Sequence, residues 1–181
     1  MVKYIAILRG INVGGRRKIL MADLRQLFSD LGFLDVSTYI QSGNVFFHTQ
    51  EAKNNIELAD SITKAIAEKY GFDVPVIIRN LEEIEEIIST HPFATETEED
   101  VARLAVTFLK TIPKTAHLSK IETYDYSPDR FKIIGNNVML FCAGKYHETK
   151  LSNKFFETKL KPPATTRNWK TVLKLAELAR K

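Results

Sequence analysis

The order of strand and helix patterns in the first half of the chain most constrains its fold. Runs typical of strands occupy residues 2–8, 36–41, 45–48 and 74–78. Apolar residues at helical spacing fill the interval before Gly32 and the interval before Gly71. A Ser-Gly-Asn turn at residues 42–44 joins the second and third strands. The resulting β-α-β-β-α-β order is typical of the ferredoxin-like plait.

The second half of the chain repeats much of this pattern. Asn80-Leu-Glu-Glu83 predicts a capping box that opens a short helix ending at His91-Pro92, and the acidic stretch Glu96–Asp100 is expected to be a linker. Further strands are predicted at 104–110, 130–134 and 138–142, and further helices at 113–124, 152–160 and 168–180. The two hairpins, at 42–47 and 135–140, also resemble each other.

We therefore predict an α+β protein of two ferredoxin-like (α/β plait) modules with mainly antiparallel sheets. Residues 1–79 are expected to form a βαββαβ plait with a Gly-rich loop. Residues 80–181 are expected to form a second plait-like α/β module with C-terminal helices. In the first strand Tyr4, Ala6 and Leu8 point to one face and Ile5 and Ile7 to the other. Because both sets are apolar, both faces of the first sheet should be covered.

Composition narrows the class of protein. The chain has 181 residues, 44% of them hydrophobic, which suits a globular core. Its single cysteine, Cys142, excludes a disulfide framework within the chain and favours a reducing compartment. No signal-peptide pattern precedes the first strand, and no apolar run approaches the ~20 residues that span a bilayer. We expect a cytoplasmic protein with no membrane partner. A net charge of +4 does not by itself indicate nucleic acid.

The loop from Arg9 to Lys18 is the most distinctive local feature. It carries three glycines, an asparagine and four cationic side chains between a predicted strand and a predicted helix. That layout presents backbone N–H groups to an anion. In a plait the first and third strands are antiparallel neighbours, so residues 9–12 should lie beside residues 42–44. Arg9, Asn12, Ser42 and Asn44 are then expected to cluster.

Several familiar site types lack essential residues. Gly10 and Gly15 have the glycine spacing of a P-loop, but Arg16-Arg17 follow in place of Lys-Ser/Thr. The third strand lacks the basic-Gly-aromatic run of RNA-recognition sheets. The four histidines have no metal-ligand spacing, and there is no Gly-x-Ser-x-Gly nucleophile elbow. No cofactor and no metal are predicted.

Residues 165–170 form a second informative segment. Thr165 or Asn168 is predicted to cap the last helix. The expected buried face of that helix consists of Trp169, Val172, Leu173 and Ala176. Arg167 is a cation beside a helix N-terminus, which is unfavourable unless an anion or a carboxylate meets it. An internal Asp or Glu is favoured over a ligand as its partner.

Four segments together resemble a known family. They are Leu8-Arg-Gly-Ile-Asn-Val-Gly-Gly15, Thr38-Tyr-Ile-Gln-Ser-Gly-Asn-Val45, Lys150-Leu-Ser152 and Thr166-Arg-Asn-Trp169. In this order they resemble the uncharacterised bacterial domain of unknown function 1697 family. The resemblance implies two plait-like α/β domains in a cytoplasmic bacterial protein, and it implies no reaction.

The leading functional hypothesis is a binding protein for an anionic, phosphate-bearing ligand at the edge between the two domains. The ligand would be a phosphorylated small molecule, a nucleotide or a nucleic acid. The predicted ligand-binding residues are Arg9, Gly10, Asn12, Gly14, Gly15, Ser42, Gly43, Asn44, Lys150, Arg167, Asn168 and Trp169. Two alternatives stay open: an enzyme of unrecognised class that uses the same cleft, and a protein-interaction module whose distinctive residues only lock loops together.

Overall fold

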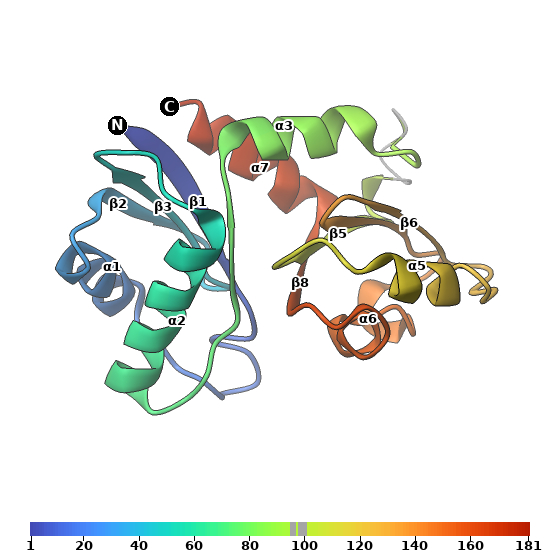
Figure 1. The fold of residues 1–181 in the computed structure, drawn as a ribbon, viewed down its shortest axis with the longest axis horizontal. Coiled ribbons are helices and arrows are strands. Elements are labelled where there is room, and N and C mark those ends of the chain that lie inside the picture. Colours follow the sequence, from blue (N-terminus) through green and yellow to red (C-terminus); the bar gives the residue numbers. More distant parts are fainter. Residues whose placement is uncertain (95–96, 98–100) are drawn as a thin grey trace. The chain divides into compact units, whose positions relative to one another are not determined.

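The chain divides into two compact units in the computed structural model, which describes residues 1–94, 97 and 101–181 (Figure 1). Unit 1 comprises Met1–Ile84 together with Glu177–Lys181, and unit 2 comprises Glu85–Ala176. The boundaries between the units fall within two helices, α3 (Leu81–Thr90) and α7 (Trp169–Ala179). The acidic linker expected at Glu96–Asp100 lies outside the described residues, apart from Thr97.

Unit 1 has the predicted β-α-β-β-α-β order. Its elements are β1 (Val2–Leu8), α1 (Met21–Asp30), β2 (Leu34–Tyr39), β3 (Asn44–Thr49), α2 (Asn55–Tyr70) and β4 (Val76–Arg79), followed by the start of α3. The strands form one sheet in the order β2-β3-β1-β4, and every neighbouring pair is antiparallel. This order is that of a ferredoxin-like plait.

Helices α1 and α2 cover one face of the unit 1 sheet (Figure 1). Alternate residues of β1 project into this core, where they pack with the apolar stripes of the two helices. Phe28, Phe33 and Phe47 form a ring cluster in it, with centroids 4.4 to 5.8 Å apart. Such ring pairs each stabilise a core by about 1 kcal/mol beyond the area they bury.

The opposite face of the sheet is apolar at its centre and polar at one end. Ile5, Ile7 and Phe46 are buried there, which confirms that both faces are covered at the centre. Lys3 and His48 pair directly across β1 and β3 in the same register. Lys3 and His48 therefore form a polar cluster on this face, at the end of the sheet where β1 begins.

Unit 2 repeats the topology. Its elements are β5 (Leu104–Leu109), α5 (Thr115–Ile121), β6 (Arg130–Ile134), β7 (Asn137–Phe141), the 3-10 turn η1 (Tyr146–Glu148), α6 (Asn153–Leu160) and β8 (Ala164–Asn168), with most of α3 and α7. The antiparallel sheet has the order β6-β7-β5-β8, equivalent to that of unit 1. Both modules are therefore plaits, as predicted.

The segment before the last helix differs from the prediction. Residues 164–168 form β8, which pairs with β5, so Thr165 lies opposite Phe108 and does not cap α7. Asn168 does cap it, because its Oδ1 accepts a hydrogen bond from the Thr171 N–H at 2.8 Å. Leu173 is 40% exposed, whereas Leu175 is buried beside Trp169, Val172 and Ala176. The β-branched Thr165 and Thr166 favour the strand over a helix entry.

Within the part of the chain that the structure describes, no helix is both long and apolar enough to cross a membrane.

Candidate functional site

The loop between β1 and α1 is a small hairpin. Val13 and Arg16 form an antiparallel bridge, and the Arg16 N–H donates to the Val13 carbonyl at 3.1 Å. The two residues between them, Gly14 and Gly15, have φ values of +58° and +74°. Two consecutive positive φ angles are typical of a type I′ turn, which glycine adopts without steric cost. The tip of the loop is thus an exposed, tightly turned ribbon.

Asn12 fixes the base of this hairpin. Its Oδ1 accepts from the Ile19 N–H at 2.9 Å, and its Nδ2 donates to the Ile19 carbonyl at 2.9 Å. The same Nδ2 donates to the Gln41 carbonyl at 3.0 Å. The Asn12 side chain therefore closes the loop and ties it to the β2–β3 turn. Ile11 and Ile19, at the two ends of the loop, are both buried.

The β2–β3 turn lies against the end of β1, as the topology predicted. The Leu8 N–H donates to the Gly43 carbonyl at 2.8 Å. A Cβ on Gly43 would stand 2.7 Å from Leu8 Cβ and 2.8 Å from Ile11 Cδ1. Asn44 is fully buried, and its Nδ2 donates to the Tyr39 carbonyl at 3.1 Å and to Ser42 Oγ at 3.4 Å. These contacts give Gly43 and Asn44 structural roles, and their roles in ligand binding stay predictions.

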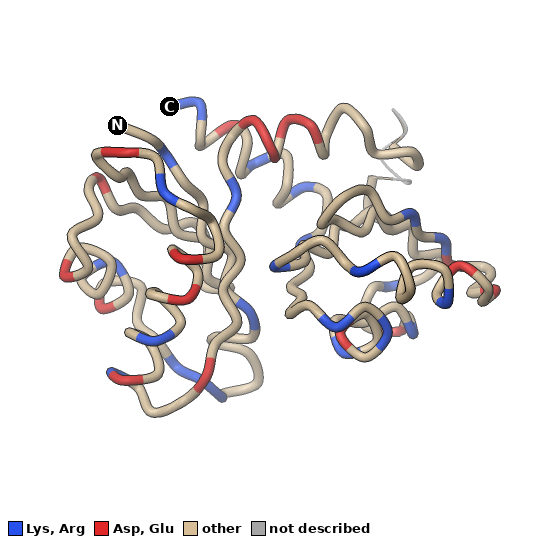
Figure 2. The backbone as a smooth tube through the Cα atoms, viewed as in Figure 1, with Lys and Arg blue, Asp and Glu red and all other residues tan. Residues whose placement is uncertain are grey.

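The cations of the loop lie at its surface. Figure 2 shows Lys and Arg gathered along the segment between β1 and α1. Arg16, Arg17 and Lys18 are exposed, and among the described residues no carboxylate pairs with any of them. The Arg17 guanidinium approaches to 3.4 Å from the point where a Gly10 Cβ would stand. Arg9 is half-buried, and its backbone N–H donates to the Pro75 carbonyl at 3.0 Å.

A cavity of about 360 Å³ opens beside this loop at the start of α1. Its lining residues are Asn12, Gly15, Lys18, Ile19, Leu20, Met21 and Gln41. Leu20 occupies the N-cap position of α1 and supplies no side-chain hydrogen bond to the first turn. The first-turn N–H groups of a helix carry partial positive charge when they lack intrahelical partners. The cations of the loop, Lys18 in the cavity and the first-turn N–H groups of α1 therefore all carry positive charge, and Asp23 adds one carboxylate to that first turn.

The predicted site residues of the second module belong to unit 2. Lys150 is exposed, just before α6. Arg167 is 8% exposed, and its Nη1 donates to Thr165 Oγ1 at 3.1 Å and to the Thr166 carbonyl at 3.0 Å. Burial lowers the pKa of Arg167 to about 10. Trp169 is buried and meets His91 edge-on, with ring centroids 4.7 Å apart.

Thr166 joins the two distinctive segments of unit 2. Its hydroxyl donates to Asn153 Oδ1 at 2.7 Å and accepts from the Tyr146 hydroxyl at 3.0 Å. It also lies 2.7 Å from Thr107 Oγ1, which is fully buried. The segments around residues 150–153 and 166–169 are thus brought together in unit 2 through this network.

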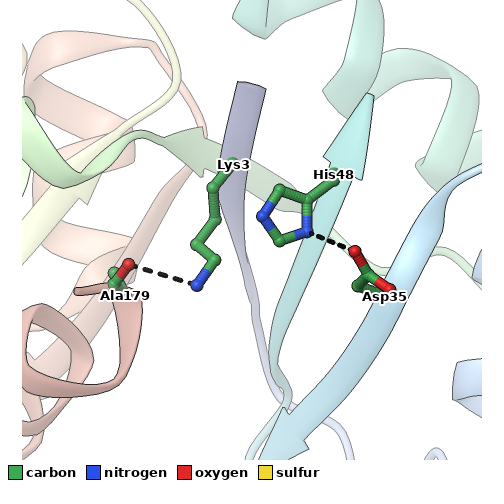
Figure 3. Close-up of polar contacts among 4 residues, drawn as sticks. All are labelled: Lys3, Asp35, His48 and Ala179. Atoms are coloured by element: carbon green, nitrogen blue, oxygen red, sulfur yellow. Dashed lines mark hydrogen bonds and ion pairs between the residues drawn. The ribbon is translucent and has the colours of Figure 1, made fainter. Parts of the chain in front are cut away.

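Sequence reasoning did not single out the polar group on the second face of the unit 1 sheet. His48 Nδ1 lies 3.5 Å from Asp35 Oδ2, and Lys3 Nζ donates to the Ala179 carbonyl at 3.2 Å (Figure 3). The predicted pairing of the first and third strands was enough to bring Lys3 near His48. Asp35 joins them through an irregularity in β2 that the sequence does not reveal. Among the described residues, no group of three or more His, Cys, Asp or Glu side chains could hold a metal ion.

Comparison with known proteins identifies relatives. The sequence profile of DUF1697, described as a protein of unknown function, matches residues 1–139. The solved structure of the conserved bacterial protein SP0830 from Streptococcus pneumoniae resembles this chain with a TM-score of 0.80 and 25% sequence identity. The match covers 100% of this chain and 99% of that one. No curated protein matches the chain significantly. These likenesses support the two-plait architecture, and their descriptions name no ligand.

Proposed function

This chain belongs to the DUF1697 family of proteins of unknown function, and we propose that it binds a phosphate-bearing anion at the loop between β1 and α1. The observation that carries the proposal is the charge of this loop. Arg16, Arg17 and Lys18 are consecutive and exposed, and no described carboxylate pairs with them. Adjacent like charges repel one another, so a bound anion would relieve that repulsion.

The cavity beside the loop supports a small ligand over a polymer. A volume of about 360 Å³ lies within the usual range for small-molecule sites. A phosphate seated there would meet Lys18 and the first-turn N–H groups of α1, which favour negative charge. The rest of a phosphorylated small molecule or nucleotide would rest on Ile19 and Met21. We place this activity in the cytoplasm, where the buried thiol of Cys142 would stay reduced.

Binding is favoured over catalysis at this loop by the residues that line the cavity. Among them Lys18 is the one titratable side chain. A hydrolase or transferase would need a positioned acid or base within hydrogen-bond reach of the reacting group. Asn12, Gly43 and Asn44 support the proposal indirectly, because they hold the loop in one conformation before any ligand arrives.

A thermal-shift experiment tests the proposal. Pyrophosphate, a nucleoside diphosphate and a short oligonucleotide are each titrated into the wild type and into the triple variant R16A/R17A/K18A. The variant K64A/K114A/K120A is the matched control, because it removes three exposed cations elsewhere and changes the net charge equally.

We expect the small phosphorylated probes to stabilise the wild type and the control, by about 2.7 kcal/mol at a hundred times the Kd. The triple loop variant should lose this stabilisation. Equal stabilisation of the two triple variants would show non-specific charge attraction and contradict the proposal. Stabilisation by the oligonucleotide alone would replace a small ligand with a nucleic acid.

A further inference from the structure

The strand β6 lies at one edge of the unit 2 sheet and borders an open groove. In the described part of the chain β7 is the strand that pairs with β6, so the other side of β6 carries no strand. A groove of about 430 Å³ follows this edge, and residues 130–133 of β6 line it together with Phe93 and parts of the segment before β6. Because the groove belongs to unit 2, what it binds does not depend on the proposed function of the β1–α1 loop.

The outer edge of β6 presents backbone groups to a further strand. Ile134 pairs with Asn137 across a two-residue turn. In such a hairpin the flanking pair exchanges both backbone hydrogen bonds, and bonded and non-bonded pairs then alternate along the strands. The N–H and C=O groups of Phe131 and Ile133 consequently point away from β7, and no described residue bonds to them there.

Two cations project from one face of β6. Arg130 and Lys132 occupy alternate positions of the strand and are exposed, and among the described residues no carboxylate forms an ion pair with either. The Arg130 guanidinium lies over the rings of Phe141 and Phe93, 4.4 and 4.9 Å from their centroids. A guanidinium that stacks on aromatic faces keeps its N–H edge for a carboxylate.

The other face of β6 is apolar. Phe131 and Ile133 pack against the core of unit 2 and remain partly exposed. Tyr126, which also lines the groove, meets the Phe131 ring edge-on, with centroids 5.3 Å apart. A strand added at this edge would therefore place its alternate side chains beside two cations and beside an apolar surface.

The carboxylates that line the groove belong to the segment before β6. Asp125 and Asp129 each accept two hydrogen bonds from groups within unit 2. Glu122 is exposed and is the C-cap residue of α5. The charge that β6 itself offers to an added strand is therefore positive.

We propose that an extended peptide with acidic side chains at alternate positions pairs with the open edge of β6 as a fifth strand. Its backbone would bond to that of Phe131 and Ile133, and strand addition of this kind is a common mode of peptide recognition. Its carboxylates would meet Arg130 and Lys132 through charge-assisted hydrogen bonds. Its intervening side chains would rest on the apolar face.

A second copy of β6 is disfavoured as the occupant of this edge. The antiparallel register that pairs Phe131 with Ile133 of the copy places Lys132 opposite the same residue of the copy. Like charges directly opposite one another destabilise a sheet, and lysine on an edge strand commonly prevents such pairing. Acidic residues at those positions of a peptide would instead be attracted.

Nuclear magnetic resonance of the full chain tests this assignment with the capped hexapeptide Thr-Val-Glu-Val-Glu-Thr as the probe. The peptide should produce saturable shifts of the Phe131 and Ile133 amides and should slow their hydrogen exchange, because both N–H groups gain acceptors. Absence of a saturable shift at these amides would overturn the proposal.

Two control peptides separate strand addition from simple charge attraction. Thr-Pro-Glu-Pro-Glu-Thr keeps both carboxylates but lacks the N–H groups that would face β6, so it should not bind saturably. Equal binding of this peptide would refute strand pairing. Thr-Val-Lys-Val-Lys-Thr should bind at least tenfold more weakly than the acidic peptide, and equal binding would refute the role of the two cations.

Charge reversal in the protein provides the matching comparison. Lys132→Glu should weaken the acidic peptide about tenfold, which corresponds to about 1.4 kcal/mol, and should strengthen the lysine peptide. Lys114→Glu, at the exposed N-cap position of α5, is the control and should bind like the wild type. Wild-type affinity of Lys132→Glu for the acidic peptide would overturn the proposal.

Two further outcomes would assign the binding elsewhere. Sedimentation of the chain without peptide should show no dimer that Lys132→Glu alters, and such a dimer would give the edge to a second copy. The loop variant R16A/R17A/K18A should keep its affinity for the acidic peptide. Loss of that affinity would place the peptide at the β1–α1 loop and contradict the proposal.

Discussion

Asn12 and Ile19 are joined by two hydrogen bonds of 2.9 Å, one in each direction between the amide side chain and the backbone. These two bonds close the base of the loop between β1 and α1 in the way that paired backbone hydrogen bonds join two antiparallel strands. Because the third bond of Asn12 reaches the Gln41 carbonyl, the loop and the β2–β3 turn hold each other in place. The shape of the proposed anion site therefore depends on a residue whose side chain bonds to the backbone of Ile19 and Gln41.

Replacing Asn12 with Ala should loosen the loop and lower stability by about 2 kcal/mol, since three backbone groups lose their partner. The Ile19 amide loses its acceptor, so its hydrogen exchange should quicken more than that of Ile5 in β1. Gln26→Ala is the control, because the exposed Gln26 bonds only within α1, to Asp30. Its cost should stay within about 0.5 kcal/mol. Equal protection of the Ile19 amide in wild type and variant would contradict this role.

Gly43→Ala should destabilise unit 1 more than Gly71→Ala does. Both glycines have positive φ, +86° and +74°, so both substitutions carry a backbone cost of about 1 kcal/mol. A Cβ on Gly71 meets no atom within 4 Å, whereas one on Gly43 collides with Leu8 and Ile11. Overpacking adds about 2 kcal/mol at Gly43. Hydrogen exchange of the β1 amides measures the difference in stability. An equal loss of stability in the two variants would show that the β2–β3 turn shifts to accommodate the added Cβ.

Thr166→Val should lower the stability of unit 2 by about 2 kcal/mol. Its hydroxyl uses its donor and both acceptor positions, and the buried Thr107 hydroxyl would lose a partner without access to water. Thr158→Val is the control, because Thr158 is exposed and its hydroxyl donates to the Lys154 carbonyl within α6. Unfolding followed by the fluorescence of Trp169, the single tryptophan, compares them. Similar losses in the two variants would show that the network adds nothing.

Unit 2 should lose stability as the pH falls below about 6.5. Burial lowers the pKa of His91 from its ordinary value of 6.5, so the unfolded chain takes up a proton at a higher pH than the folded chain does. Unfolding is then favoured by acid, with a slope of at most about 1.4 kcal/mol per pH unit, until the pH passes the folded pKa. The Phe93 N–H donates a hydrogen bond to His91 Nδ1 at 3.3 Å. A proton on Nδ1 would remove the acceptor of this bond and so would also destabilise the folded unit.

The variant His91→Gln isolates this contribution. It retains polar atoms beside Trp169 but does not titrate, so its stability should depend less steeply on pH in this range. Trp169 fluorescence during urea unfolding at each pH gives the slope. The same slope in both proteins would assign the acid sensitivity to other groups.

Local signals in the sequence were sufficient to predict most elements. Gly71 ends α2 in a left-handed conformation, and the Asn80–Glu83 capping box forms with two reciprocal bonds of 2.8 Å. The meeting of the β1–α1 loop with the β2–β3 turn followed from strand order alone. β8 was missed because it is short and leads directly into α7, so helix capping could account for the same residues.

The partners of individual side chains were harder to predict than the strand order. Asp35 reaches His48 only because β2 slips its register, and no residue type specifies where a bulge occurs. The contacts of Arg167 with Thr165 and the Thr166 carbonyl depend on its place in β8, the strand that was not predicted.

Unit 1 is discontinuous in the chain, because residues 177–181 belong to it although they follow all of unit 2. During synthesis the first plait leaves the ribosome well before this last segment is made. The hydrogen bond from Lys3 to the Ala179 carbonyl can therefore form only after unit 2 has been translated. A released chain that ended at residue 84 would lack residues 177–181 of this unit. The pocket that Leu178 and Lys181 line together with Lys3 and His48 would be completed last, as a late step of maturation.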